Sequence, residues 1–198
     1  MIERGPATEA NMIATFLQAE ADPNSHWSDC VKAGLAAIRA KRSLIESPNL
    51  EDPAENRSRK DLLFSYRQGQ FVGFPADTTW RTVDLQPEDF RAILYMDHAN
   101  WNEFSSQTRL VCEGARNLSK FASDGRFQHI FAICQAIGAG KPLLPLVAAH
   151  RDGGRLVLIE GHSRATAYAA VGFGGLVRAL VGSSSSMNEW MHYRFESS

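Results

Sequence analysis

The spacing of apolar residues predicts helices in the first third of the chain. An apolar stripe at helical spacing runs through residues 9–19, with Met12, Ile13, Phe16 and Leu17 as its members. The proline-containing stretch 22–25 interrupts this pattern, which resumes through residues 27–45. Residues 47–60 are polar, contain two prolines and show no apolar period, so they predict a surface loop. A short helix or helix end is predicted at residues 62–66.

From about residue 71 the pattern becomes typical of strands and turns. Aromatic and β-branched residues, together with Gly and Pro, dominate residues 71–85, and residues 79–85 alternate as a strand. Pro and acidic residues at its start predict a helix over residues 86–98. Residues 101–120 fit neither period, and a further helix is expected within residues 121–139.

The hairpin in the last third gives the clearest pattern. Residues 143–148 and 156–159 are short apolar strands, and between them residues 151–154 carry the Asp-Gly signature of a hairpin turn. A loop at residues 160–164 leads into a predicted helix over residues 165–171. The chain therefore predicts the order strand, hairpin, strand, loop and helix.

The remaining pattern completes the predicted fold. Residues 176–181 predict another strand, and the serines at 183–186 predict the entry to a last helix over residues 187–194. We therefore expect an α/β fold in which a small mixed sheet with helices occupies residues 72–198. Residues 1–66 are expected to be a helical extension of the same core, so that all 198 residues form a single domain.

Composition places the chain among ordinary globular proteins of the cytoplasm. It is 44% hydrophobic and 22% charged, and a net charge of −1 offers no global basic field for nucleic acid or for a membrane. Its three cysteines, which have no C-x-x-C spacing, predict neither a disulfide framework nor a zinc site: Cys30, Cys112 and Cys134. No signal peptide or membrane-spanning run is recognisable.

The segment Glu160-Gly161-His162-Ser163-Arg164 has the residue types of an anion site. Gly161 lets the backbone approach a ligand, Ser163 offers a hydroxyl at a helix start, and Arg164 lies beside the free N–H groups of the first turn. A plain strand-to-helix connection with a capping serine and a solvated arginine explains the same residues. Local physics therefore leaves both interpretations open.

The stretch from Gly161 through Arg164 to Ala167 fits the motif G-x-x-R-x-x-A, and it resembles the ParB/sulfiredoxin-like superfamily. The flanks are similar as well, since an apolar strand, an Asp-Gly hairpin and a strand ending in an acid-Gly pair precede the motif. The resemblance covers residues 79–190, whereas residues 1–70 resemble no family that we recognise. It implies a bound nucleotide, namely ATP, ADP or CTP, with its phosphates on the Gly-x-x-Arg loop.

Within this superfamily the loop is most similar to that of the free-serine kinases, with Glu160 in place of Asp and Ser163 in place of Thr. Sulfiredoxins carry a catalytic Cys directly after the motif Gly, where this chain has His162, so sulfinic-acid reduction is disfavoured. Chromosome-partitioning ParB proteins append a DNA-binding helix-turn-helix domain. Only eight residues follow Trp190 here, so a role in DNA segregation is disfavoured.

The resemblance implies an NTP- or ADP-dependent phosphotransferase or phosphohydrolase that acts on a small molecule. Under it, Glu160 binds Mg²⁺ or acts as a base, and His162 stabilises phosphate or shuttles a proton. Gly161, Ser163 and Arg164 bind the nucleotide. The simpler alternatives are an acid that faces solvent at a strand end and a loop histidine without a role.

Thr108 and Arg109 are a second candidate pair for nucleotide binding. They follow Trp101 in an irregular segment, where Thr and Arg could line a pocket and clamp a phosphate or a carboxylate. Arg116 could join the same face of a helix. A buried tryptophan beneath a loop with an exposed arginine is the alternative.

Two other functional classes stay open at this point. One is a non-catalytic module that senses a nucleotide or another ligand and acts through a protein partner. The other is a nucleic-acid-binding or nuclease-like relative of ParB. The sequence decides neither the base of the nucleotide, nor the acceptor, nor whether the protein forms a homodimer.

Overall fold

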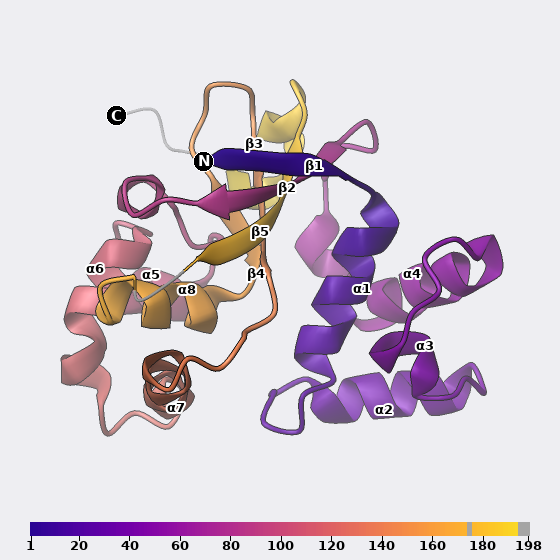
Figure 1. Cartoon of the computed structure of the whole chain (residues 1–198), viewed down its shortest axis with the longest axis horizontal. Coiled ribbons are helices and arrows are strands. Elements are labelled where there is room, and N and C mark those ends of the chain that lie inside the picture. The colour runs from indigo at the N-terminus through magenta and orange to yellow at the C-terminus, as the bar shows by residue number, and fades with distance from the viewer. Residues whose placement is uncertain (174–175, 194–198) are drawn as a thin grey trace. The chain divides into compact units, whose positions relative to one another are not determined.

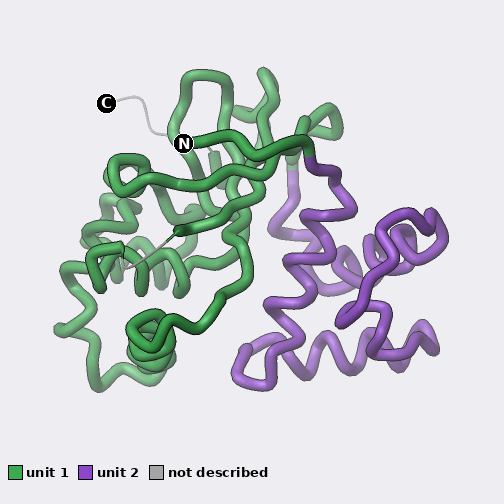
Figure 2. The backbone as a smooth tube through the Cα atoms, in the orientation of Figure 1, with its two compact units in different colours: residues 1–6, 73–198 green, residues 7–72 purple. Residues whose placement is uncertain are grey.

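The computed structural model describes residues 1–173 and 176–193, and the chain divides into two compact units (Figure 2). The sheet unit contains residues 1–6 and the chain from residue 73 onward, and the helical unit contains residues 7–72. The candidate site lies entirely in the sheet unit.

A mixed sheet forms the centre of the sheet unit, as the sequence predicted, and it has five strands (Figure 1). The strand order is β1-β2-β5-β3-β4; β5 is antiparallel to β2 and parallel to β3, and β3 is antiparallel to β4. The strands are β1 (Ile2–Ala7), β2 (Thr79–Leu85), β3 (Leu146–His150), β4 (Val157–Glu160) and β5 (Val177–Ser183). The hairpin β3-β4 and strands β2 and β5 lie close to their predicted positions.

Strand β1 corrects the prediction that residues 1–66 are helical. The side chains of β1 carry no strand-like apolar alternation, and distant charges hold it at the edge of the sheet. Arg4 pairs with the buried Asp84 of β2, Glu3 pairs with Arg81, and the terminal ammonium of Met1 pairs with Asp89. Burial alone would raise the pKa of Asp84, but hydrogen bonds from Arg4 and Arg178 outweigh burial and lower it.

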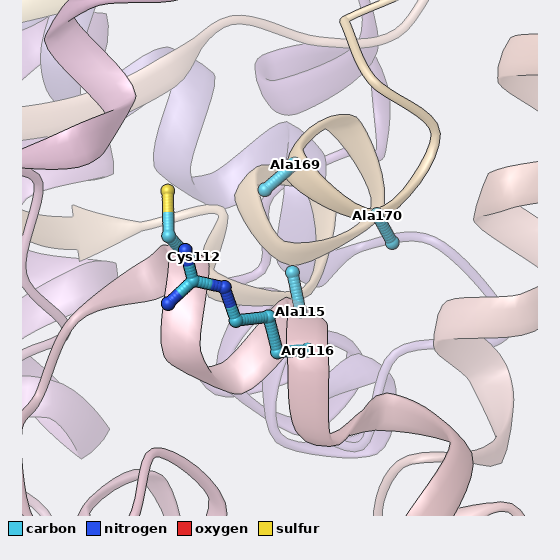
Figure 3. A pocket seen from close by; sticks show the side chains of 5 residues that line it. All are labelled: Cys112, Ala115, Arg116, Ala169 and Ala170. Carbon is cyan, nitrogen blue, oxygen red and sulfur yellow. The ribbon is translucent and has the colours of Figure 1, made fainter.

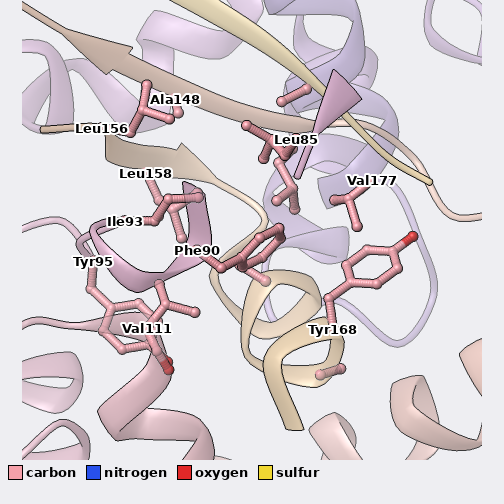
Figure 4. Close-up of a cluster of buried hydrophobic side chains, with 14 of the residues drawn as sticks. Leu85, Phe90, Ile93, Tyr95, Val111, Ala148, Leu156, Leu158, Tyr168 and Val177 are labelled. Carbon is pink, nitrogen blue, oxygen red and sulfur yellow. The ribbon is translucent and has the colours of Figure 1, made fainter. Parts of the chain in front are cut away.

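Helices of the sheet unit pack around α8. Contacts with α8 are made by both α6 and α7, and one apolar cluster joins these helices to the sheet (Figure 4). The helices are α5 (Ala99–Phe104), α6 (Val111–Asn117), α7 (Gln128–Gly138) and α8 (His162–Ala170). The cluster fixes the start of α8 relative to α7, which matters for the site below.

Two predicted helices of the sheet unit were wrong. In place of a helix over residues 86–98 there is a 3₁₀ turn, Asp89–Arg91, followed by an extended segment in which Leu94 forms isolated bridges to Leu110 and Val157. Three consecutive residues, Ile93, Leu94 and Tyr95, are each at most 1% exposed. Their backbone groups are hydrogen-bonded to residues 109–111 and 156–158, and these long-range bonds replace the bonds within a helix. The last helix is replaced by 3₁₀ turns at Met187–Glu189 and Met191–Tyr193, and residue 194 lies outside the described residues.

The helical unit contains α1 (Glu9–Glu20), α2 (Ser28–Ala37), α3 (Ser43–Glu46), α4 (Pro53–Arg67) and a 3₁₀ turn, Gln68–Phe71. The prediction for α1 is confirmed, whereas the helical pattern over residues 27–45 is divided between α2 and α3. The surface loop predicted over residues 47–60 is confirmed for residues 47–52 and was wrong from Pro53, where α4 begins. Asp52 caps this helix by accepting hydrogen bonds from Ala54 N and Glu55 N, and proline suits the first helical turn.

Candidate functional site

The start of α8 is built by a glycine in the left-handed region. Strand β4 ends at Glu160, Gly161 has φ +93°, and α8 begins at His162, three residues before the predicted helix start. The first helical hydrogen bond runs from Ala165 N to Gly161 O at 2.8 Å. The helix therefore offers no acceptor to the backbone N–H groups of the residues just before Ala165.

Gly161 itself is explained by backbone and packing. A Cβ atom at this position would lie 2.7 Å from Leu146 Cδ2 and 3.0 Å from Arg164 Nη2, and its φ is one that other residues rarely adopt. Side chains of the protein fill the space beside Gly161. Close approach of a ligand to its backbone, which the sequence suggested, is not needed to account for the glycine.

Arg164 folds back over the loop and is loosely held. Its Nη2 donates to Pro145 O at 3.3 Å and forms an ion pair with Glu160 Oε1 at 3.4 Å. The side chains of Arg164 and Glu160 are 14% and 18% exposed. Arg164 Nε is buried and has no hydrogen-bond partner among the described residues. A buried guanidinium donor without an acceptor fits a site that takes up an anion.

Glu160 is the carboxylate that the resemblance assigns to Mg²⁺. No group of three or more His, Cys, Asp or Glu side chains that could hold a metal occurs in residues 1–173 and 176–193. Mg²⁺ is commonly bound by one or two carboxylates together with substrate phosphates. Glu160 fits that role as a single carboxylate, provided that phosphate oxygens complete the coordination.

His162 lies in the core. Its side chain is buried, and its ring stacks on Trp101 of α5 at 5.2 Å and on Tyr95 at 6.1 Å between centroids. Its Nε2 accepts a long hydrogen bond from Met96 N at 3.5 Å. The geometry describes an aromatic side chain that attaches the start of α8 to α5. The catalytic role that the resemblance implies for His162 stays a prediction.

Ser163 has a partner that sequence reasoning missed. Its Oγ lies 2.6 Å from Nε2 of His129, in the first turn of α7, although 34 residues separate them. Partial burial lowers the pKa of His129. No local pattern marks His129, because only the packing of α7 on α8 brings it to the loop.

Thr108 and Arg109 bind backbone groups of their own neighbourhood. Thr108 Oγ1 donates to Ser105 O at 2.8 Å, and the guanidinium of Arg109 donates to Tyr95 O at 3.0 Å and to His192 O. Burial lowers the pKa of Arg109. In this arrangement the two side chains hold a loop in shape, and their predicted contact with a nucleotide stays untested.

The loop that carries Arg109 has an unusual backbone. Ser106, Gln107 and Arg109 adopt φ of +52°, +66° and +60°. Non-glycine residues in this region cost free energy and persist where the surroundings over-determine them. The hydrogen bonds of Arg109 to Tyr95 O and His192 O supply such surroundings. Arg109 and His162 thus contact adjacent residues of one short segment, Tyr95 and Met96.

An open cleft of about 300 Å³ lies at the other end of α8, and Figure 3 shows the side chains that line it. Its lining residues come from α6 and from the last turn of α8: Cys112, Ala115, Arg116, Ala169 and Ala170. Arg116 is ion-paired with Glu113 of the same helix. Residues 160–164 take no part in this cleft, so Arg116 belongs to a different surface from the predicted loop.

Comparison of this chain with protein-family models, curated proteins and solved structures finds no match. The ParB/sulfiredoxin-like resemblance therefore stays a hypothesis based on the motif and its flanking elements. Among the described residues, the helices are all too short or too polar to span a bilayer.

Proposed function

We propose that this chain binds a nucleotide with its phosphates at the start of α8, and that it transfers or hydrolyses a phosphoryl group as a phosphotransferase or phosphohydrolase acting on a small molecule. The observation that carries the proposal is that the guanidinium of Arg164 lies at the start of this helix, with a side chain only 14% exposed, and is held there by few and weak contacts. Its two contacts are long, at 3.3 and 3.4 Å. A phosphate oxygen would supply a stronger acceptor.

The backbone supports the same ligand. The amides of Ser163 and Arg164 precede the first helical donor, Ala165, so they are oriented toward the helix start, where the helix dipole also favours negative charge. A planar guanidinium and several N–H groups around one point form the usual arrangement for a phosphate. A solvated arginine would not need to be 86% buried, as follows from its 14% exposure.

Glu160 completes the proposed site. Its ion pair with Arg164 keeps the carboxylate beside the phosphate position, and the same carboxylate would hold Mg²⁺. When bound, Mg²⁺ would neutralise charge on the phosphate oxygens and help to orient them. Binding of a phosphate to Arg164 would weaken the ion pair and release Glu160 for that role.

A non-catalytic sensing module is the second candidate, because of the position of His162. Its ring is stacked on Trp101 and Tyr95 in the core, which suits a structural side chain better than a proton shuttle. Under this alternative, the loop binds the same nucleotide without turnover. Arg164 would then report that the nucleotide is bound, because its guanidinium would leave Glu160 and pair with the phosphate.

A thermal-shift panel with the full chain tests the proposal, using ATP, ADP, CTP and GTP with and without Mg²⁺. A ligand that binds only the folded state stabilises it by RT ln(1 + [L]/Kd), about 2.7 kcal/mol at 100 Kd. We expect at least one nucleotide to raise the Tm, and we expect its consumption in a phosphate-release assay with small hydroxyl compounds. Binding without consumption would select the sensor, and absence of any shift would reject nucleotide binding.

A further inference from the structure

Ser163 and His129 form a nucleophile–base pair where α7 and α8 pack on each other. Ser163 is a half-buried side chain in the first turn of α8, and His129 is exposed in the first turn of α7. Their Oγ and Nε2 atoms are 2.6 Å apart, a short distance for this type of hydrogen bond. The other recorded side-chain hydrogen bond between α7 and α8 is a long one, from Cys134 Sγ to Ala167 O at 3.9 Å.

The protonation of His129 suits a base. Although the residue as a whole is exposed, desolvation of the ring lowers the pKa of its imidazole and so favours the neutral form. In the tautomer with the proton on Nδ1, Nε2 accepts the hydrogen bond from the hydroxyl of Ser163. A neutral imidazole within hydrogen-bond reach of a serine hydroxyl is the arrangement that activates such a hydroxyl as a nucleophile.

The surroundings of Ser163 suit an electrophile that gains negative charge. The backbone N–H groups of Ser163 and Arg164 have no acceptor within α8, because Ala165 donates the first helical hydrogen bond. The guanidinium of Arg164 lies at the same helix start, where its Nη2 contacts Pro145 O at 3.3 Å and Glu160 Oε1 at 3.4 Å. Donors arranged in advance around a reacting group stabilise the charge that develops on its oxygens.

We infer that Ser163 is a nucleophile that takes up a phosphoryl group, with His129 as its general base. In the step, a bond forms between Ser163 Oγ and phosphorus while the bond from phosphorus to its leaving group breaks. The leaving group departs with that electron pair, and the proton of Ser163 passes to His129 Nε2. The inference deepens the proposed function and rests on it for the natural phosphoryl donor, a nucleoside triphosphate.

A fluorophosphonate probe tests the inference without any nucleotide. Attack by Ser163 Oγ on this probe breaks the phosphorus–fluorine bond, releases fluoride and leaves a stable ester. We expect intact-mass and peptide-mapping measurements on the full chain to locate the adduct at Ser163. Ser163→Ala should abolish this adduct, and His129→Gln should slow labelling by about 10²–10⁴-fold, the usual effect of losing a general base.

Two controls keep the result specific. His26→Gln changes an exposed histidine of the helical unit and should leave the labelling rate unchanged. Ser185 is an exposed serine without a recorded histidine partner among the described residues, and it should remain unlabelled. Absence of an adduct at Ser163, or equal labelling rates for the wild type and His129→Gln, would overturn the inference.

The nucleotide panel separates this inference from the proposed function. A nucleotide that raises the Tm while Ser163 stays unreactive would retain nucleotide binding and reject the nucleophile. Labelling at Ser163 without any nucleotide-dependent shift would retain the nucleophile and reject the nucleotide. If both hold, a bound nucleotide should shield Ser163 and lower the labelling rate.

Discussion

Two buried arginines, one in each unit, differ in how completely the protein uses them. Arg59 of α4 is 0% exposed, and its terminal nitrogens have four acceptors. Two of these are carbonyl oxygens, Leu44 O at 3.1 Å and Asn49 O at 2.9 Å, and the others are the side chains of Glu55 and Asn56. Arg59 thereby connects α4 to α3 and to the segment between the two helices.

The side chain of Arg164 of α8 is 14% exposed and has only two long contacts, to Pro145 O and to Glu160. In both arginines Nε is buried and lacks a hydrogen-bond partner within the described residues, so Nε alone does not distinguish them. The two arginines differ instead in the number and the length of the contacts that their terminal nitrogens make. The comparison teaches that a saturated guanidinium stabilises a fold, whereas a loosely held one at a helix start can exchange its partner for a ligand.

The largest expected effect concerns the carboxylates that pair with the two arginines. Glu160→Gln should lower turnover by about 10²–10⁴-fold, whether Glu160 holds Mg²⁺ or takes the acceptor proton. Nucleotide affinity should be kept or increased, because the change removes repulsion toward phosphate and frees Arg164. Steady-state kinetics beside isothermal titration measure both effects. Glu55→Gln is the matched control, and equal loss of turnover in it would contradict the assignment.

The second prediction concerns the stability of the helical unit. Arg59→Leu leaves the carbonyls of Leu44 and Asn49 without their donor, so it should lower the free energy of unfolding by about 2–4 kcal/mol. Urea denaturation gives the size, and hydrogen exchange followed by mass spectrometry should locate the loss in residues 43–67. Arg57→Leu, at an exposed position of the same helix, should stay within about 0.5 kcal/mol. A similar loss of unfolding free energy in both variants would contradict a structural role for the hydrogen bonds of Arg59.

Arg164→Ala should affect binding more than folding. Loss of a charge-assisted hydrogen bond to phosphate should weaken nucleotide binding by about 1.5–3 kcal/mol, which is at least tenfold in Kd. Stability should fall less than in Arg59→Leu, since only two long contacts are lost. Isothermal titration and urea denaturation of the same samples check the two parts. Arg116→Ala, at the other end of α8, is the control, and an unchanged Kd for Arg164→Ala would refute the site.

The smallest expected effect concerns the glycine beside Arg164. Gly161→Ala should lower the free energy of unfolding by about 1–3 kcal/mol, because φ of +93° is unfavourable for alanine and its Cβ would meet Leu146. Gly125→Ala, where no atom would lie within 4 Å of the new Cβ, should have little effect. Thermal denaturation compares the two. Full stability of Gly161→Ala would mean that the loop adapts, and that the glycine serves ligand approach after all.

The local sequence pattern was enough to predict an element wherever one short segment has a clear periodicity or turn motif. The stripe ending in Phe16 and Leu17 predicted α1, and alternation predicted β2. The Asp-Gly signature predicted the hairpin β3-β4, and the mixed α/β class followed from these elements. The residues of the loop from Glu160 to Arg164 were also identified from sequence, because glycine, serine and arginine at a helix start form a local pattern.

Contacts between distant residues decided what the sequence did not show. Strand β1 forms because Arg4 reaches Asp84, a residue 80 positions away, and no local period signals that pair. Residues 47–60 look like a loop because their inward side chain is a charged one, Arg59, which becomes buried only when α4 and its neighbours surround it. Polar patterns therefore hide helices whose buried face is hydrogen-bonded instead of apolar.

The features of the candidate site also fall into those that the sequence shows and those that depend on tertiary contacts. The sequence by itself determined which residue types lie at the start of α8, since adjacent positions on one turn need no partner to be recognised. Only the tertiary structure decided that Ser163 meets His129, that His162 turns into the core, and that Arg164 folds back on Glu160. The physical reason is that side-chain direction and pairing depend on what the neighbouring elements place around the loop, and two of these, α5 and α7, are far away in the chain.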